Sequence, residues 1–329
     1  MGETSSQHSA INVLSQALPF PSLSGHAFSC IRSMLEQNTN VKIRFCHAVS
    51  TALSLSDIPT PPLGTPGSGL DGEDYFSPKT YESAVAVRDY QGPSKGLLPS
   101  PNPVVPPSTI QVSILERYIP PTSCNEIVSL FDPTGPCLLV DRLVELSPDG
   151  GKLLFIYPTQ KGGKTFASKY LGPIIDPLLR SMTVVDGLFS DLASILGRMQ
   201  SIDTLYPYDD LKSKMESLCE RLSSRGKASR GRYHGQPTTF SVVYAAPKTS
   251  KLERKIWSRE WWVRQEELRI RTSVKRYFDA VQKLPDGSDA AHTRLIQSVL
   301  DGVMSRPYPD NIEPEEEIEV GLFVILRST

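Results

Sequence analysis

The chain has 329 residues, of which 39% are hydrophobic, and its 35 lysines and arginines are balanced by 36 aspartates and glutamates. This length accommodates one large α/β domain or two smaller ones, and the modest apolar fraction predicts that part of the chain stays outside the packed core. The near-zero net charge excludes the strong positive field that drives non-specific binding to nucleic acid.

The five cysteines are widely spaced and form no C-x-x-C pair, and the five histidines are scattered along the chain. These patterns argue against a disulfide framework, and we predict no metal site. No apolar run approaches the roughly 18 residues of a membrane-spanning helix, and residues 1–9, which we expect to be disordered, do not resemble a secretory signal. The sequence therefore predicts a cytoplasmic or nuclear protein that is neither secreted nor bound in a membrane.

Residues 10–50 are predicted to form the first β-α-β part of an α/β domain. A short apolar strand at Ile11–Leu14 precedes a helix at His26–Gln37, and a second strand follows at Val41–Val49. The helix places apolar residues on one face at helical spacing, as expected for a helix that packs on a sheet.

Residues 51–108 form a Pro/Gly-rich linker or insertion, because 11 of the chain's 28 prolines lie between Pro59 and Pro107. Such composition disfavours long helices and strands, although a short helix is predicted at Lys79–Val87. The segment also contains Ser/Thr-Pro steps of the type that proline-directed kinases accept, at Thr60, Thr65, Ser77 and Ser100. Flexible linkers are rich in the same residues, and this composition is the favoured explanation of these steps.

The α/β pattern resumes in residues 109–329, which we assign to the remainder of the same domain. Its most informative part is Leu138–Phe166, where an amphipathic helix, a Gly-Gly turn and the continuous apolar run Leu153–Tyr157 follow one another. Such a run is typical of a strand that is covered on both faces in a parallel sheet. Ligands bind beyond the carboxyl ends of such strands, so Pro158–Lys164, predicted as a loop, is the first place to look for a site.

The other predicted elements alternate in the same way. They are a strand at Ile110–Ile119, helices at Thr165–Met182 (kinked at Gly172 and Asp176), Val184–Met199 and Asp209–Leu222, a strand at Thr238–Ala246, helices at Leu252–Leu284 and Ala290–Met304, and a last strand at Val320–Leu326. The predicted fold is α/β, a mostly parallel Rossmann-like sheet with helices on both faces and a helical insertion at residues 250–305.

Two basic segments are candidates for contact with nucleic acid, although neither is favoured for it. Residues 223–236 read as a flexible basic loop in which the stretch Arg225–Arg232 contains no acidic residue. The helix around Trp257, Trp261 and Trp262 mixes aromatic and basic residues, which suits stacking on single-stranded nucleic acid. Interspersed glutamates favour the alternative, in which the tryptophans dock this helix on the core.

A phosphate-binding alternative begins at the same buried strand. The sequence that follows, Pro158 to Thr165, resembles a P-loop with proline in place of the first glycine. In this interpretation Gly162 and Gly163 expose backbone N–H groups to phosphate, Lys164 reaches the terminal phosphate and Thr165 binds magnesium. A solvated basic loop would have the same composition.

The second half resembles the C-terminal half of class I S-adenosylmethionine-dependent methyltransferases. The resemblance covers roughly residues 110–170 and rests on a strand at Val112–Tyr118, a helix, the turn Ser147–Gly151 and the buried strand at Leu153–Tyr157. It implies a Rossmannoid sheet that ends in an antiparallel pair, here Phe240–Tyr244 and Val320–Leu326.

The resemblance also implies S-adenosylmethionine as cofactor, with contacts from Gly25, Glu116 and Tyr118. The family's glycine-rich turn is degenerate here, because the connection after the first strand contains a single glycine, Gly25, at its end. The acidic residue expected after the second strand is absent, since that strand ends at Val49-Ser50. No catalytic residue follows from the sequence.

Three hypotheses remain after these observations. The first is a methyltransferase-like Rossmannoid protein, either an S-adenosylmethionine-dependent methyltransferase or a catalytically degenerate relative. The second is a non-enzymatic interaction or regulatory protein that keeps the fold and binds a protein partner. The third is a nucleotide-binding protein that uses Gly162–Thr165.

Overall fold

The computed structural model describes residues 10–22, 25–39, 41–50, 80–90, 98–132, 134–185, 187–228, 238–281 and 288–329. In this part of the chain seven strands form one sheet in the order β3-β2-β1-β4-β5-β7-β6. The strands are β1 (Ile11–Leu18), β2 (Ile43–Ser50), β3 (Thr80–Val87), β4 (Val112–Arg117), β5 (Asp149–Pro158), β6 (Thr239–Ser250) and β7 (Ile318–Ser328).

Strands β1 to β5 are parallel, and β7 is antiparallel to both of its neighbours, β5 and β6. The predicted α/β class, the mostly parallel sheet and the antiparallel final strand are therefore confirmed. The chain progresses from β1 toward β3 in one direction and from β4 onward in the other, so the strand order reverses between β1 and β4. This reversal is the topological switch point of the sheet.

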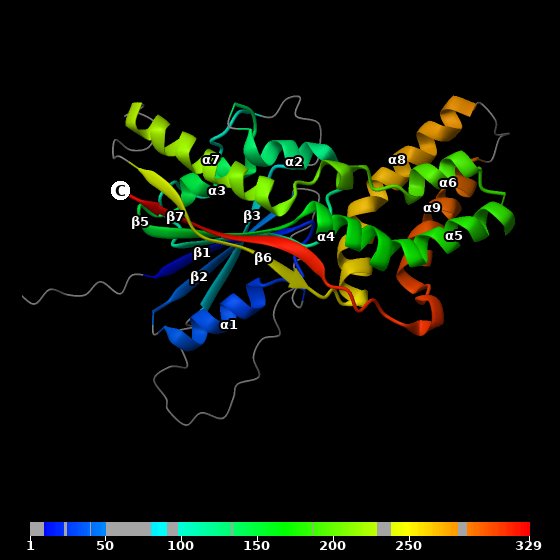
Figure 1. Ribbon diagram of the computed structural model, residues 1–329, viewed down its shortest axis with the longest axis horizontal. Helices are drawn as coiled ribbons and strands as arrows, with labels where there is room; N and C mark the ends of the chain where they lie inside the picture. Colours follow the sequence, from blue (N-terminus) through cyan, green and yellow to red (C-terminus); the bar gives the residue numbers. More distant parts are fainter. Residues whose placement is uncertain are drawn as a thin grey trace, which may run out of the picture.

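Helices lie on both faces of the sheet and beyond one end of it (Figure 1). They are α1 (Phe28–Asn38), α2 (Cys124–Phe131), α3 (Leu138–Glu145), α4 (Gln160–Thr165), α5 (Gly172–Val185), α6 (Ser190–Gly197), α7 (Tyr208–Ala228), α8 (Val263–Val281) and α9 (Ser288–Ser305). Two π-helical segments, η2 (Phe166–Leu171) and η4 (Ile256–Trp262), lead into α5 and α8, and two short 3-10 turns are η3 (Gln200–Thr204) and η5 (Pro309–Asn311).

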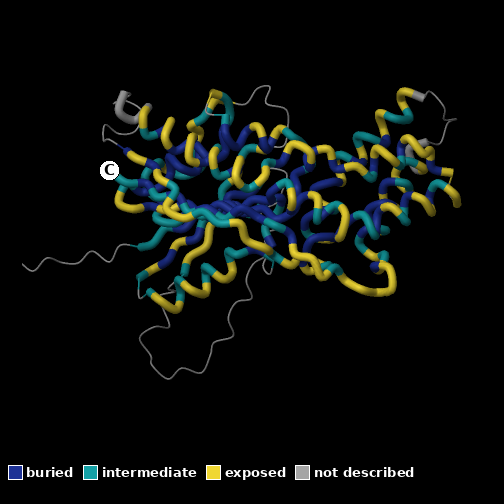
Figure 2. The backbone as a smooth tube through the Cα atoms, viewed as in Figure 1, coloured by how far each residue is buried: buried dark blue, intermediate teal, exposed yellow. Residues whose placement is uncertain are grey.

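Each face of the sheet has its own apolar core. Helix α1 packs through Phe28, Ile31 and Leu35 on the face of β1, β2 and β4. Helices α2, α3 and α7 cover the opposite face, and Figure 2 shows the buried sheet running between these layers. The helix spacing predicted for α1 thus corresponds to real packing.

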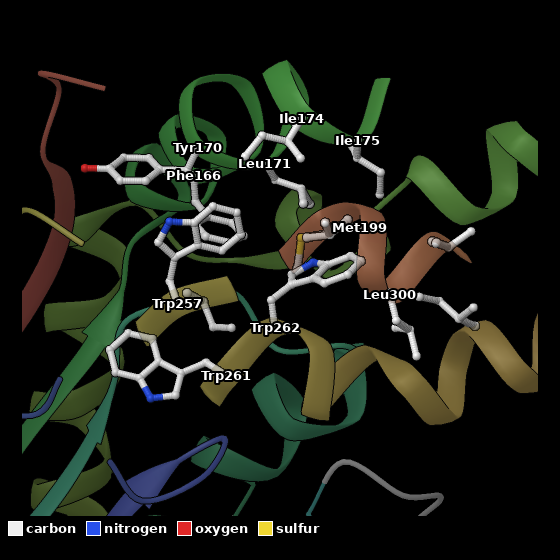
Figure 3. Packing of buried hydrophobic residues seen from close by; sticks show 14 of the residues in the cluster. Phe166, Tyr170, Leu171, Ile174, Ile175, Met199, Trp257, Trp261, Trp262 and Leu300 are labelled. Carbon is white, nitrogen blue, oxygen red and sulfur yellow. The ribbon is translucent and has the colours of Figure 1, made fainter. Parts of the chain in front are cut away.

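A helical lobe made of η2, α5, α6, η4, α8 and α9 extends from the carboxyl ends of the strands (Figure 1). Its core is built around Trp257, Trp261 and Trp262, whose side chains are at most 1% exposed. Figure 3 shows Trp257 beside Phe166 and Tyr170, whereas Trp262 lies toward Met199. The tryptophans therefore dock the lobe, and they are not available to stack on nucleic acid.

The helix predicted at Lys79–Val87 is wrong, because Thr80–Val87 forms β3, parallel to β2 along its whole length. Half-buried and exposed residues, with only Val87 buried, and a high content of Val, Thr and Tyr suit an edge strand better than a helix. Residues 98–108 also contact the domain, because the backbone N–H groups of Asn102 and Val104 donate to Asp141 and Glu145 of α3. Of the four Ser/Thr-Pro steps, only that at Ser100 lies within the described residues, and its hydroxyl forms hydrogen bonds with the backbone of Cys137. The steps at Thr60, Thr65 and Ser77 lie outside the described residues.

Two further expectations are corrected. The expected loop Pro158–Lys164 is absent, because β5 runs to Pro158 and α4 begins at Gln160. The predicted kink at Gly172 is instead the end of the π-helical segment η2, and the helix continues through Pro177 to Val185. In this segment α4 packs on β7, and Phe166 and Tyr170 of η2 pack on Trp257 of η4, contacts that local turn propensity does not report.

Candidate functional site

A cavity of about 550 Å³ lies at the switch point of the sheet. Its walls come from the carboxyl ends of β1, β2 and β3, from the start of α2 and from one side of α8. This is the position at which open α/β sheets bind ligands, and the volume is in the usual range for small-molecule sites. None of the residues that line the cavity belongs to β5 or α4.

The strand side of the cavity is mainly apolar. Leu18 ends β1 and Pro19–Pro21 follow it, Ala48 and Val49 lie in the last residues of β2, and Val87 ends β3. Asp89 and Arg88, just after β3, add the charged groups on this side. An apolar floor with a few polar groups at its edge suits a flat, partly apolar ring system that carries polar substituents.

The opposite wall is one side of α8. Arg264, Leu268, Thr272 and Arg276 recur every four residues and all line the cavity, as do Gln265, Arg269 and Ser273 on the adjacent stripe. Residues four apart lie above one another on one face of a helix. Leu268 is 72% exposed although it is apolar, because it stands at the rim of this wall.

Buried polar contacts hold α8 against the end of β4. Gln265 accepts a hydrogen bond of 2.6 Å from Arg117 and donates one of 2.9 Å to the carbonyl oxygen of Pro120. Arg117 also forms an ion pair of 2.6 Å with Glu126 of α2, and the hydroxyl of Tyr157 donates to the same carboxylate. Burial raises the pKa of Tyr157 well above its usual value, so this hydroxyl stays a donor at neutral pH. The network fixes the wall of the cavity relative to the sheet.

A second buried cluster supports the strand side. Asp141 of α3 accepts hydrogen bonds from the hydroxyl of Tyr90 and the backbone of Asn102. Arg142 donates to Gln16, which lines the cavity, and forms an ion pair of 2.9 Å with Glu145. Burial raises the pKa of Glu145 to about 7, against the opposing effect of Arg142.

The residues predicted to contact the cofactor, Gly25, Glu116 and Tyr118, are brought together at the start of α1, but none of the three lines this cavity. The carboxylate of Glu116 accepts hydrogen bonds from the backbone N–H groups of Ala27 (2.7 Å) and Phe28 (3.1 Å), at the start of α1. The hydroxyl of Tyr118 donates to the same carboxylate at 3.2 Å. Glu116 therefore occupies the helix N-terminus at which doubly wound folds bind an anionic ligand group.

Burial dominates the ionisation of this cluster. It raises the pKa of Glu116 to about 7, although the hydrogen bonds from Ala27, Phe28 and Tyr118 favour the charged carboxylate. It lowers the pKa of His26 to about 4, so His26 is neutral at pH 7 and its 3.8 Å contact with Glu116 is not an ion pair there. Burial likewise raises the pKa of Tyr118, which keeps its hydroxyl protonated.

Gly25 approaches protein rather than open space. A Cβ atom at this position would lie 2.4 Å from Ile256 and 2.5 Å from Trp261, both in η4. Trp261 also stacks on Tyr118, with ring centroids 5.8 Å apart. In Figure 3 this indole points away from Phe166 and Tyr170. The single glycine of the β1–α1 connection thus serves close packing against the helical lobe.

The phosphate-binding alternative has a different geometry from a P-loop. Gly162, Gly163, Lys164 and Thr165 lie within α4, whose first turn is capped by the hydroxyl of Thr159 accepting from the N–H of Gly162. A Cβ at Gly162 would lie 1.9 Å from the carbonyl oxygen of Glu319 in β7, and one at Gly163 2.5 Å from Leu205. Lys164 is exposed. These glycines allow α4 to pack against β7 and η3.

The basic stretch Arg225–Arg232 is only partly described. Helix α7 extends to Ala228, and Arg230 and Arg232 lie outside the described residues. Among the described residues no group of three or more His, Cys, Asp or Glu side chains is placed to hold a metal ion. In the same part of the chain, no helix combines the length and apolar character that crossing a membrane requires.

Sequence reasoning missed the residues that form the cavity. The four-residue spacing of Arg264, Leu268, Thr272 and Arg276 was visible as a signal, because it mixes an exposed leucine with arginines on one helix face. No local pattern relates this helix to the ends of β1, β2 and β3, which are brought to it only by the strand order. Asp89 was likewise hidden in a segment expected to be a linker.

Comparison with models of known protein families yields no match to this chain, and comparison with curated proteins yields none either.

Proposed function

We propose that the protein is a methyltransferase-like Rossmannoid protein that binds a nucleoside-containing ligand in the cavity at the switch point. S-adenosylmethionine is the ligand that the sequence resemblance suggests. The observation that carries the proposal is the position of the cavity, which is bounded by the carboxyl ends of β1, β2 and β3 and closed by α8.

The lining of the cavity supports binding of a base and a ribose. Leu18, Val49 and Leu268 offer apolar surface for a flat ring. Asp89, Ser50 and Thr272 provide oxygens at the edge that suit ribose hydroxyls or an exocyclic amine. Asp89 follows β3, so a carboxylate reaches the cavity although β2 ends without one.

In this proposal the protein lacks the usual contacts to the amino-acid part of S-adenosylmethionine. The carboxylate of Glu116 already accepts from the N–H groups of Ala27 and Phe28, and Trp261 lies against Gly25. An amino-acid carboxylate on the ligand therefore gains no contact from the start of α1. We expect the nucleoside part of the ligand to supply most of the affinity. This is the binding mode that we expect of a catalytically degenerate relative.

A non-enzymatic interaction protein is the second candidate. The contact between Glu116 and the start of α1 favours this candidate, because a buried glutamate that accepts from the N–H groups of a helix N-terminus stabilises the fold without a ligand. In this case the cavity would bind none of the nucleoside ligands.

Titration calorimetry with S-adenosylmethionine, S-adenosylhomocysteine and adenosine tests the proposal. We expect all three to bind, with dissociation constants within about tenfold of one another, because the shared nucleoside carries the affinity. Absence of heat with all three would overturn the proposal and leave the interaction protein.

A cavity-filling variant locates the site. Thr272→Trp fills the cavity from the α8 wall and should weaken binding of adenosine at least tenfold. Glu267→Trp is the matched control, because Glu267 is exposed on the same helix and does not line the cavity. Equal loss in both variants would place the ligand elsewhere.

A further inference from the structure

We infer that the ligand of the switch-point cavity carries a phosphate group that is bound by guanidinium groups of the α8 wall, so that a nucleotide fits better than a neutral nucleoside. This inference rests on the proposed nucleoside binding and names the ligand class of the same cavity. The geometry that points to it is the pair of arginines, Arg264 and Arg276, at the two ends of the α8 stripe.

The other charged groups around the cavity are largely compensated by partners. Arg117, which anchors the wall, is paired with Glu126, and Arg269 is paired with Glu266. Arg88 lies 3.6 Å from Asp141 and donates to the carbonyl oxygen of Leu98. These pairs leave little net charge for a ligand to meet.

Arg264 and Arg276 differ from these residues. Neither takes part in any ion pair that the described residues form, and both are exposed at the cavity rim. Asp89 contributes one negative charge on the facing strand side, so the two arginines leave the lining cationic. A guanidinium group matches phosphate in charge and in the geometry of its donors.

The length of the wall also favours a nucleotide. Arg264 and Arg276 are twelve positions apart in the helix, which corresponds to a rise of about 18 Å. Leu268 and Thr272 lie between them on the same stripe. A base can thus pack on the apolar middle of the wall while a phosphate reaches one of the arginines at its ends.

The cationic wall bears on S-adenosylmethionine as well. Its sulfonium adds a positive charge that phosphate-bearing ligands do not have, and like charges on ligand and wall oppose binding. The wall therefore selects for an anionic ligand within the class that the cavity shape accepts.

The test is calorimetric titration of the full chain with adenosine, AMP, ADP and inorganic pyrophosphate, without added metal, at low and high salt. We expect AMP or ADP to bind at least tenfold more tightly than adenosine at low salt. This gain should shrink at high salt, because the two arginines are exposed and their field is screened, whereas adenosine affinity should not change.

Variants of the wall identify the groups involved. The double variant Arg264→Ala/Arg276→Ala should lose the tenfold gain of AMP or ADP over adenosine, with all three ligands titrated into the same variant. Lys275→Ala is the control, because Lys275 is exposed on the same helix and does not line the cavity, and it should keep the gain. Thermal unfolding followed by circular dichroism checks that the variants remain folded.

The outcomes separate this inference from the proposed function. If adenosine binds and phosphate adds nothing, the inference is overturned and nucleoside binding stands. If pyrophosphate binds through the two arginines while adenosine does not bind, the anion site stands and the nucleoside proposal is overturned. Absence of binding by every probe overturns both.

Discussion

The ends of β1 and β5 look alike in the sequence and differ in the structure. Both are interior strands with at least one parallel neighbour, and a glycine lies close to the start of the helix that follows each of them, Gly25 before α1 and Gly162 within α4. A cavity of about 550 Å³ opens beside the end of β1, whereas the end of β5 is packed under α4 and β7. Strand order explains the difference. The connection after β1 leads to one side of the sheet and the connection after β4 leads to the other, so the switch point lies between these two strands.

The two helix starts beyond these strands are alike in another way, since protein oxygens satisfy both. Glu116 accepts from the first N–H groups of α1, and the hydroxyl of Thr159 accepts from Gly162 in α4. Thr159 is in turn bonded to Glu319 at 2.8 Å. Protein oxygens thus already accept from N–H groups at both helix starts, so the open volume at the switch point is the better guide to a ligand site.

The largest expected effect is at Gly162. In an ordinary helix, replacement of glycine by alanine stabilises by up to about 1 kcal/mol. Here the Cβ of Gly162→Ala would lie 1.9 Å from the carbonyl oxygen of Glu319, so the helix must move away from β7. We expect a loss of about 3 kcal/mol or more in the free energy of unfolding, measured in urea.

Lys161→Ala is the control for this prediction. It removes only an ion pair in which the lysine is 76% exposed, so we expect a change below about 0.5 kcal/mol. A Gly162→Ala protein as stable as the wild type would mean that α4 does not pack closely on β7, and the end of β5 would again be a candidate site.

Much of the fold follows from the sequence because its strands are apolar runs of the expected length. The segment Leu153–Tyr157 is a buried interior strand, and Val320–Leu326 is the antiparallel strand beside it. The prediction failed at β3, where an eight-residue edge strand follows a proline-rich stretch. Its pattern is weak because only Val87 is buried, and pairing with β2 rather than local propensity defines it.

The candidate site was less predictable for a physical reason. Gly25, Glu116 and Tyr118 were predicted to contact a cofactor, and the structure brings the three together without testing that role. Sequence could not show that Trp261, more than 200 residues further along the chain, fills the space next to Gly25. Long-range packing decides whether a glycine faces a ligand or a side chain.

The second prediction concerns the pH dependence of the free energy of unfolding. It tests whether the carboxyl group of Glu116 is buried at the start of α1. An ordinary glutamate carboxyl has a pKa near 4.5, and burial raises the pKa of Glu116 to about 7 in the folded protein. The folded protein therefore binds more protons than the unfolded chain between these pH values, and its stability falls as pH rises through this window. Glu116→Gln cannot titrate, so the wild type should lose up to roughly 3 kcal/mol relative to this variant between pH 5 and pH 8.

Urea unfolding of both proteins at pH 5 and pH 8 measures this change. His26, with its pKa lowered to about 4, has the opposite effect between pH 4 and 6.5, but it is present in both proteins and largely cancels. Glu267→Gln, on the exposed side of α8, is the matched control for replacing a glutamate by glutamine. A difference between the wild type and Glu116→Gln that stays constant with pH would show that Glu116 gains no proton on folding.

The smallest expected effect is that of Lys164→Ala, which tests whether the end of β5 holds a phosphate site. Lys164 is exposed on α4, beside glycines that are buried against Glu319 and Leu205. A lysine that grips phosphate contributes strongly to affinity, whereas an exposed lysine without such a role changes stability by less than about 0.5 kcal/mol. We therefore expect Lys164→Ala to leave both the free energy of unfolding and any heat of titration with magnesium-ATP unchanged. If magnesium-ATP binds and this variant alone loses it, the end of β5 holds a phosphate site despite its close packing, because no other role of this exposed ammonium group would produce that loss.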